Sequence, residues 1–198
     1  MFPLFETIAV ENYKPKLLEY HQQRMDSSFL DLFHQINPFS LSKLFLELNI
    51  KSNGLLKWKV EYSCDGCVSF VTPYFPRLIS RVKFVEVNPD FDYSMKFCNR
   101  DYFELLKKDN PQYDELILLR NGELTDSTFS NIVLEDTAKG LLCTPSTPLL
   151  NGIQRQYLLD NKTIIPIPVS IHQLHEYSRV YFINAMLDMS IAPYWDIE

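Results

Sequence analysis

The sequence is short of long apolar runs, of basic clusters and of glycine. No stretch of its 198 residues comes near the roughly 20 consecutive apolar residues of a membrane-spanning helix, so no membrane partner is expected. The formal net charge is -6 and the basic residues are not clustered, which argues against nucleic acid as a partner. Glycine occurs five times, without a G-x-G-x-x-G or P-loop pattern, which excludes the simplest nucleotide-binding sites. Glu6 interrupts the apolar start where a signal peptide needs an unbroken core, so a cytoplasmic protein is expected.

Cysteine is also scarce. It occurs four times, and only Cys64 and Cys67 stand at C-x-x-C spacing, which can hold zinc or support redox chemistry. Here the pair falls between two strand-like runs and encloses Asp65-Gly66, which is typical of a tight hairpin turn. No second Cys or His pair stands at metal-ligand spacing elsewhere in the sequence. The pattern therefore favours a hairpin turn, and no metal site is predicted.

Apolar periodicity predicts a mixture of helices and strands. Helical spacing is expected after Pro15 through residue 33, in 40–50 with Ser40 as cap, near 101–108 and over 153–160. Strands are expected over 4–10, in a hairpin of 55–63 and 67–74, and over 81–87, 113–119 and 130–136. The end of the chain alternates 163–169, a short helix and 179–186. Because regular βαβ alternation is missing, an α+β fold is predicted rather than a Rossmann sheet.

The segment 72–80 contains two prolines and divides the chain. We interpret it as the approach to a connection between two lobes. The predicted division is a small α/β lobe of residues 1–78 and a larger lobe of residues 79–198.

Four segments stand out in order along the chain: FETIAV with LLEYHQQRM, then MKFCNRDYFELL, NGELTDSTFSNIVL and TPSTPLLNGIQRQYLL. Together they resemble the class IV (fold-type IV) pyridoxal-phosphate (PLP) enzymes, a family of aminotransferases and lyases. FETIAV with LLEYHQQRM resembles their opening, where a helix carries His-x-x-Arg. MKFCNRDYFELL resembles the region of their cofactor lysine, and NGELTDSTFSNIVL the segment that supplies an acid to the pyridine nitrogen. TPSTPLLNGIQRQYLL is similar to their phosphate-binding helix start. The resemblance implies PLP as cofactor and a larger lobe, with a mixed-sheet pseudo-barrel, that binds it.

The resemblance implies that Lys96 forms the Schiff base with PLP and is the catalytic residue. The alternative is a solvated surface lysine, which describes most lysines. The family also implies that Arg24 binds the cofactor phosphate, although an arginine whose stem covers the core edge has the same helical position. For His21, three residues earlier, a hydrogen-bonded core-edge role and a functional role remain open.

Asp126 stands where the family usually has glutamate, one methylene longer. The resemblance implies that it pairs with the pyridine nitrogen, where an acid keeps the ring electron-withdrawing. The alternative is that Asp126, in T-D-S-T, caps a turn. Asn131, five residues later, is expected to support local structure.

The residues that follow Leu150 start a predicted helix, and free N–H groups at a helix start favour an anion. The resemblance implies that Gly152, Ile153 and Gln154 offer this start to the PLP phosphate. A plain helix start with Asn151 as N-cap is the alternative. A further phosphate contact is implied near two later residues, Asn184 and Ala185.

Two patterns favour the lyase branch of the family. Lys96 is followed by Phe-Cys-Asn-Arg, and the K-x-x-N-R pattern resembles the aminodeoxychorismate lyases, as does N-G-I-x-R-Q followed by Tyr157. The implied reaction converts 4-amino-4-deoxychorismate to pyruvate and 4-aminobenzoate, on the folate branch. An aminotransferase for branched-chain or D-amino acids stays open. So does a non-catalytic relative, because the chain starts almost at the FET segment.

The family also implies a homodimer with a small-molecule substrate. The active site would lie between the lobes, close to the dimer interface. Arg100 and Arg120 are candidates for binding substrate carboxylates, by charge only.

Overall fold

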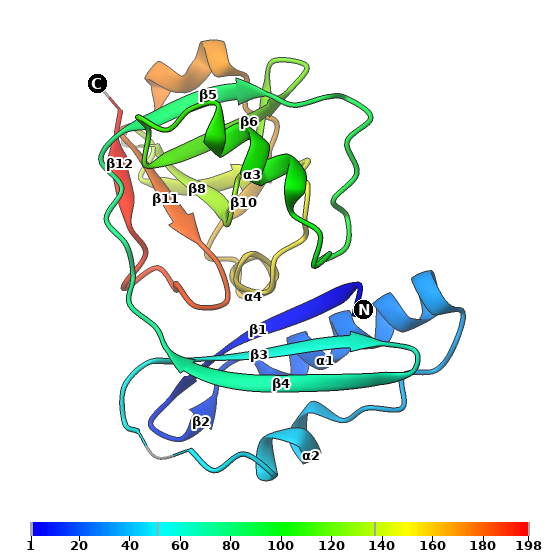
Figure 1. The fold of residues 1–198 in the computed structure, drawn as a ribbon. Helices are drawn as coiled ribbons and strands as arrows, with labels where there is room; N and C mark the ends of the chain where they lie inside the picture. The colour runs from blue at the N-terminus through cyan, green and yellow to red at the C-terminus, as the bar shows by residue number, and fades with distance from the viewer. Residues whose placement is uncertain (1, 51, 137, 198) are drawn as a thin grey trace. The chain divides into compact units, whose positions relative to one another are not determined.

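The computed structural model describes residues 2–50, 52–136 and 138–197 and divides the chain into two compact units (Figure 1). The first unit comprises the residues up to Phe75 together with Met95–Asn99, and the second comprises Pro76–Ser94 and the residues from Arg100 onward. The predicted division after residue 78 did not anticipate that a short later segment joins the first unit. None of the described helices is both long and apolar enough to cross a bilayer.

The first unit is built on a four-stranded antiparallel sheet in the order β2-β1-β3-β4. The strands are β1 (Leu4–Glu11), β2 (Lys14–Pro15), β3 (Leu56–Ser63) and β4 (Gly66–Pro73). Along β3, buried and half-buried residues alternate, as expected for a strand with one face in the core. The predicted hairpin is confirmed, but its turn lies one residue earlier than the Asp65-Gly66 pair suggested: Ser63 pairs with Gly66, so that Cys64 and Asp65 form the two-residue turn.

Two helices and a π-helical turn follow β2 in this unit (Figure 1). They are α1 (Leu18–Ser28), the turn Phe29–Phe33 that continues it, and α2 (Leu41–Leu46). The Ser40 hydroxyl accepts a hydrogen bond from the Lys43 N–H, which confirms the predicted cap, although α2 ends earlier than expected. Their buried side chains, among them Met25 and Phe29, pack with Trp58 and its strand neighbours into one apolar core.

The second unit contains an eight-stranded mixed sheet with a central order β10-β9-β8-β7-β6-β5. Its strands are β5 (Val82–Glu86), β6 (Glu115–Arg120), β7 (Glu123–Ser127), β8 (Asn131–Asp136), β9 (Leu141–Pro145), β10 (Ile165–Ile167), β11 (Arg179–Ile183) and β12 (Tyr194–Asp196). β11 pairs with both β8 and β12. The β5–β6 and β9–β10 pairs are parallel, and the other pairs are antiparallel. The mixture of helices and strands confirms the predicted α+β fold, and the curl of this sheet into a half-barrel agrees with the pseudo-barrel that the resemblance implied.

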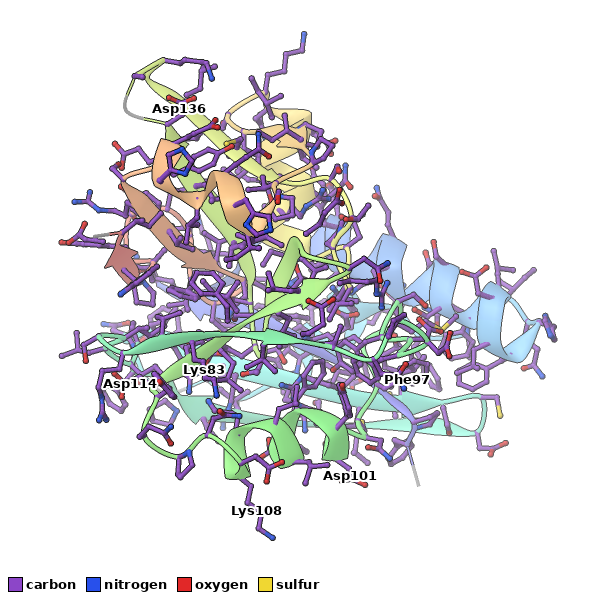
Figure 2. The ribbon with its side chains drawn as sticks, turned by 90° about the horizontal axis from the view of Figure 1, so that it is seen from above. Lys83, Phe97, Asp101, Lys108, Asp114 and Asp136 are labelled. Atoms are coloured by element: carbon purple, nitrogen blue, oxygen red, sulfur yellow. The ribbon has the colours of Figure 1, made fainter. Side chains whose placement is uncertain are left out.

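Three helical segments accompany this sheet: α3 (Asp101–Lys108), α4 (Ile153–Asp160) and a 3-10 helix, Ile171–Glu176. α3 carries Phe103 inward and Lys108 outward, where the lysine extends away from the ribbon (Figure 2). α4 places Leu158 against Val133 and Ile183 in a small apolar cluster. Both α3 and α4 coincide with the predicted helices.

Candidate active site

The lysine singled out by the sequence lies in the segment Met95–Asn99 of the first unit. This segment is attached to the start of β1: the Phe5 N–H donates to the Lys96 carbonyl at 3.1 Å, and the Cys98 N–H donates to the Pro3 carbonyl at 2.8 Å. The Lys96 ammonium lies 4.7 Å from the centre of the Phe5 ring. The lysine is half-buried and held through its backbone, which differs from a lysine on a solvated loop.

Arg24 belongs to a second cluster of the first unit, built around Glu6. The Arg24 guanidinium donates from Nε and Nη2 to the two Glu6 carboxylate oxygens, at 2.8 and 2.5 Å. The His21 Nδ1 lies 2.5 Å from Glu6 Oε2, and both side chains are fully buried. The hydrogen-bonded core position considered for His21 is therefore found.

Burial alone would raise the pKa of Glu6, but the Arg24 charge and the His21 hydrogen bond lower it to about 2. Burial lowers the pKa of His21, against the opposing effect of Glu6. We therefore assign a neutral imidazole that donates from Nδ1 to a carboxylate. The carboxylate fixes the plane of the guanidinium through two parallel hydrogen bonds.

Asp126 lies in β7 of the second unit and is the acid of that unit's site. Its Oδ1 accepts a hydrogen bond from Asn131 Nδ2 at 2.6 Å, and its Oδ2 accepts one from the Leu150 N–H at 2.9 Å. The second partner is 24 residues away, so Asp126 is not the local turn cap considered from the sequence. Burial raises the pKa of Asp126 to about 6, against the lowering effect of these hydrogen bonds and of the Arg155 charge.

The start of α4 lies beside this acid. The N-cap is Gly152, which has no side chain to cap the helix, and Asn151 contacts Gln156 and Arg155 instead. The N-cap alternative for Asn151 is therefore wrong. The first turn, with Ile153 and Gln154, begins from this glycine, and all three residues are buried. A helix start without a side-chain cap suits an anion, because its first N–H groups lack intrahelical acceptors.

Gly152 is required by its neighbour. A Cβ on this residue would lie 1.9 Å from the Asn131 Oδ1, whereas its φ of -73° is open to any residue. The requirement is therefore one of space rather than of backbone conformation.

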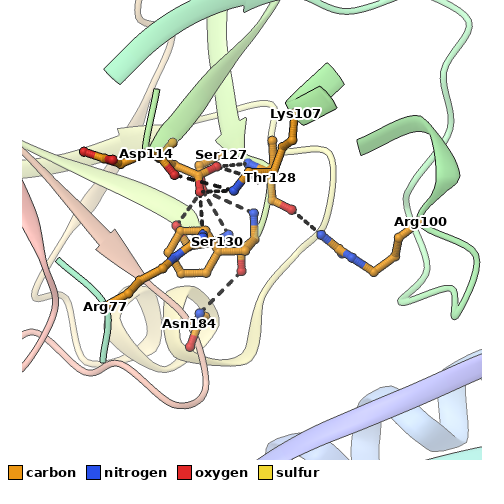
Figure 3. A network of polar contacts seen from close by, with 10 residues as sticks. Arg77, Arg100, Lys107, Asp114, Ser127, Thr128, Ser130 and Asn184 are labelled. Atoms are coloured by element: carbon orange, nitrogen blue, oxygen red, sulfur yellow. Dashed lines mark hydrogen bonds and ion pairs between the residues drawn. The ribbon is translucent and has the colours of Figure 1, made fainter. Parts of the chain in front are cut away.

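The loop between β7 and β8, whose Thr128 and Ser130 are labelled in Figure 3, is anchored by the buried carboxylate of Glu115. Glu115 Oε1 accepts hydrogen bonds from the Thr128 N–H at 2.9 Å and from its hydroxyl at 2.5 Å. Glu115 Oε2 pairs with Arg77 at 2.5 Å and with Lys107 at 3.4 Å. Arg100 donates to the Thr128 carbonyl (Figure 3). These contacts fix the loop that connects Asp126, in β7, to Asn131 at the start of β8.

The last pair of implied phosphate ligands lies in a turn after β11. The Asn184 N–H donates to the Leu187 carbonyl at 3.2 Å, and Asn184 Oδ1 accepts from the Met186 N–H at 2.8 Å. Asn184 Nδ2 approaches the Phe129 carbonyl at 3.4 Å, which links this turn to the β7–β8 loop (Figure 3). Ala185, which lies between Asn184 and Met186 in the chain, is half-buried. The turn is thus connected to the loop that follows Asp126.

The two arginines that were candidates by charge both make contacts inside the second unit. Arg100 contacts the Tyr93 hydroxyl as well as the Thr128 carbonyl, and its guanidinium lies 4.8 Å from the Phe103 ring centre. Arg120 donates to the Phe91 carbonyl at 2.5 Å. Both side chains therefore stabilise the second unit through these contacts.

The chemistry of the second unit's residues suits two parts of a PLP molecule, its ring nitrogen and its phosphate. Burial raises the pKa of the Asp126 carboxyl because it removes water that would solvate the charge. A cationic ring N–H beside this carboxylate would compensate for the lost solvation. The uncapped start of α4 suits a phosphate. Sequence reasoning missed Glu6 and Glu115, whose partners lie 15 to 18 and 8 to 38 positions away. The sequence signal that could have identified both residues is an acidic residue within an otherwise mostly apolar strand.

Comparison with known proteins adds a family to this geometry. Residues 3–193 match the family model for amino-transferase class IV. An uncharacterized protein of Haemophilus influenzae is 30% identical over 191 residues, which covers 94% of this chain and 98% of that protein. A crystal structure from Haemophilus somnus 129pt, described provisionally as a 4-amino-4-deoxychorismate lyase, has a TM-score of 0.88. It is 32% identical, over 96% of this chain and 98% of that one. A hypothetical aminotransferase of Mycobacterium tuberculosis, in its PLP-bound form, has a TM-score of 0.76 at 15% identity, over 98% of this chain and 80% of that one. The last likeness concerns the fold alone.

Proposed function

The chain belongs to the class IV aminotransferase family, and on this premise we propose that it is a PLP-dependent 4-amino-4-deoxychorismate lyase. The observation that carries the choice is the likeness, over almost the whole of both chains, to the Haemophilus somnus protein provisionally described with that activity. The K-x-x-N-R pattern at Lys96, with Asn99 and Arg100, supports the same branch.

Each residue that is implied to bind the cofactor has a proposed task. Lys96 would hold the reactive carbonyl of PLP, and Arg24 would bind its phosphate. Asp126 would keep the ring nitrogen protonated, and the start of α4, with Gly152 and Ile153, would bind the phosphate through backbone N–H groups. Asn184 and Ala185 remain proposed as further phosphate contacts.

PLP, when bound, supplies an electron-withdrawing ring that stabilises negative charge on a substrate carbon after loss of a proton. Lys96 would take that proton from the ring carbon that bears the amino group of the substrate. The bond between the neighbouring carbon and the enolpyruvyl oxygen then breaks. Lys96 is also the group that can return a proton, so that one base serves successive steps. The products are 4-aminobenzoate, whose aromatisation drives the reaction, and pyruvate.

The test is to supply the purified protein and PLP with 4-amino-4-deoxychorismate and to measure both products. A lyase forms 4-aminobenzoate, followed by its fluorescence, and pyruvate, followed with lactate dehydrogenase, in equal amounts. Lys96→Ala should abolish both. Lys108→Ala, which removes an exposed lysine of α3, should leave the rate unchanged.

Two results would contradict the proposal. An aminotransferase would form no pyruvate from this substrate and would instead convert an amino acid and a keto acid into each other. A non-catalytic relative would bind PLP and form neither product.

A homodimer is proposed as well, and light scattering on the eluted protein would test it.

A further inference from the structure

Asn131 makes one side-chain amide serve two neighbours in the second unit. Its Nδ2 donates to Asp126 Oδ1 at 2.6 Å and to the Leu150 carbonyl at 2.8 Å, so both of its N–H bonds have acceptors. The Leu150 N–H in turn donates to Asp126 Oδ2 at 2.9 Å. Asp126, Asn131 and Leu150 therefore form a closed ring of three hydrogen bonds.

The oxygen of the Asn131 amide constrains the residues that follow Leu150. Asn131 Oδ1 occupies the space in which a Cβ of residue 152 would lie, 1.9 Å from the ideal position. The amide thus touches the loop that precedes α4 at two places, the carbonyl of Leu150 and the Cα of Gly152. Asn131 itself is 5% exposed, so water does not compete strongly for these contacts.

We propose that Asn131 is a positioning residue, whose amide fixes the separation between the carboxylate of Asp126 and the start of α4. This inference rests on the proposed function, because that function assigns the carboxylate to the ring nitrogen of PLP and the helix start to its phosphate. The nitrogen and the phosphate lie on a rigid ring and a short arm. A protein that already holds the carboxylate and the helix start at a set distance loses little freedom when it binds the ring nitrogen and the phosphate.

The register of the sheet explains why this position carries an asparagine. Asp126 and Asn131 are paired across β7 and β8, near the ends of the strands that the loop of residues 128–130 joins. Side chains of directly paired residues lie on the same face at short distance. An aspartate at 131 would place two carboxylates together, and a serine could donate only one hydrogen bond. Only an amide of this length donates to both acceptors.

The test compares Asn131→Ala with the wild type in the binding of three ligands to the PLP-free protein. The first is 4′-deoxypyridoxine 5′-phosphate, which carries both ring nitrogen and phosphate but no carbonyl, so that Lys96 chemistry is not involved. The second is 4′-deoxypyridoxine, the same molecule without its phosphate, and the third is inorganic phosphate. The two-ended ligand should bind about tenfold more weakly or worse to the variant, since the hydrogen bonds that tie the Asp126 carboxylate to the loop before α4 are lost. Inorganic phosphate should bind within about threefold of the wild type, because the N–H groups of α4 remain.

A matched control is Asn161→Ala, which removes an asparagine that donates to the Tyr157 carbonyl at the other end of α4. It should bind all three ligands as the wild type does. A second readout is the Asp126 carboxyl signal in the 13C spectrum of the PLP-free protein. Its pKa should rise in Asn131→Ala, because Asn131 lowers that pKa in the wild type, and should be unchanged in the control.

The outcomes separate the two proposals. If Asn131→Ala does not fold, Asn131→Ser replaces it, with an intermediate loss expected because one of the two hydrogen bonds can persist. Equal affinity of wild type and variant for the two-ended ligand, or an equal loss for inorganic phosphate, would overturn the role of Asn131. If the wild type binds neither the two-ended ligand nor PLP, the cofactor assignment itself fails.

Discussion

The raised pKa of Asp126 makes a quantitative statement about stability. Burial raises this pKa from 3.8 to about 6, and the carboxyl is 4% exposed, so solvent screening is small. A shift of that size corresponds to about 3 kcal/mol. In the PLP-free protein, that free energy opposes folding whenever Asp126 is ionised.

The direction with pH follows from proton binding. Between pH 3.8 and about 6 the folded protein binds the Asp126 proton more tightly than the unfolded chain does. The free energy of unfolding contributed by this group therefore falls as the pH rises through that window, and the penalty is complete above it. Bound PLP should remove much of the penalty, because a protonated ring nitrogen favours the ionised carboxylate.

The assay is urea unfolding at a series of pH values from 4 to 8, for the wild type and Asp126→Asn. The variant leaves one donor without an oxygen acceptor, but that cost does not depend on pH and cancels when the two pH dependences are compared. From pH 4 to 8 the wild type should lose about 2.5 kcal/mol relative to the variant, since the first part of the loss lies below pH 4. The exposed residue Asp109 supplies a control, Asp109→Asn, which should follow the wild type. Parallel curves for wild type and Asp126→Asn, or a relative gain of the wild type with rising pH, would refute the reasoning.

Two further predictions concern one residue in each unit. Gly152→Ala should cost about 1–3 kcal/mol of stability and weaken PLP binding, because the new Cβ would lie 1.9 Å from Asn131 Oδ1. Thermal unfolding and PLP titration would measure this against Gly54→Ala, where the nearest atom is 3.9 Å away; equal effects would contradict the packing argument. Glu6→Gln should destabilise the protein by about 1–3 kcal/mol, because it removes a buried carboxylate that pairs with the half-buried Arg24 guanidinium and accepts from His21. Urea unfolding against the exposed control Glu47→Gln would reveal this, and matching midpoints would mean that Glu6 is not needed.

The elements of the fold with strong periodicity could be predicted from the sequence. β3, with its strict alternation, and α3 and α4 were found close to their true bounds. β7 and β9 were missed. β7 reads E-L-T-D-S, which is polar by composition, although four of its five residues are buried. Its polar side chains are satisfied by partners from other strands and loops, which a local pattern does not reveal.

The site was predictable only in part for the same reason. Asp126 and Gly152 could be selected through family resemblance, but the hydrogen-bonded ring that links them depends on register and on a loop 24 positions later. Periodicity also could not show that Met95–Asn99 joins the first unit, since that contact depends on backbone hydrogen bonds to Pro3 and Phe5 and on the packing of Met95 and Phe97 against a distant core. Long-range pairings of this kind follow from the folded topology rather than from any short stretch of residues.

The central claim is that Lys96 bears the cofactor, and one measurement tests it most directly. The purified protein is supplied with PLP, its visible absorbance is recorded, and borohydride is added before the labelled peptide is identified by mass spectrometry. The account predicts a visible band that borohydride bleaches, with the label on the peptide that contains Lys96, and no such band in Lys96→Ala. A band of equal strength in the variant, a label on another lysine, or no band in either protein would contradict it.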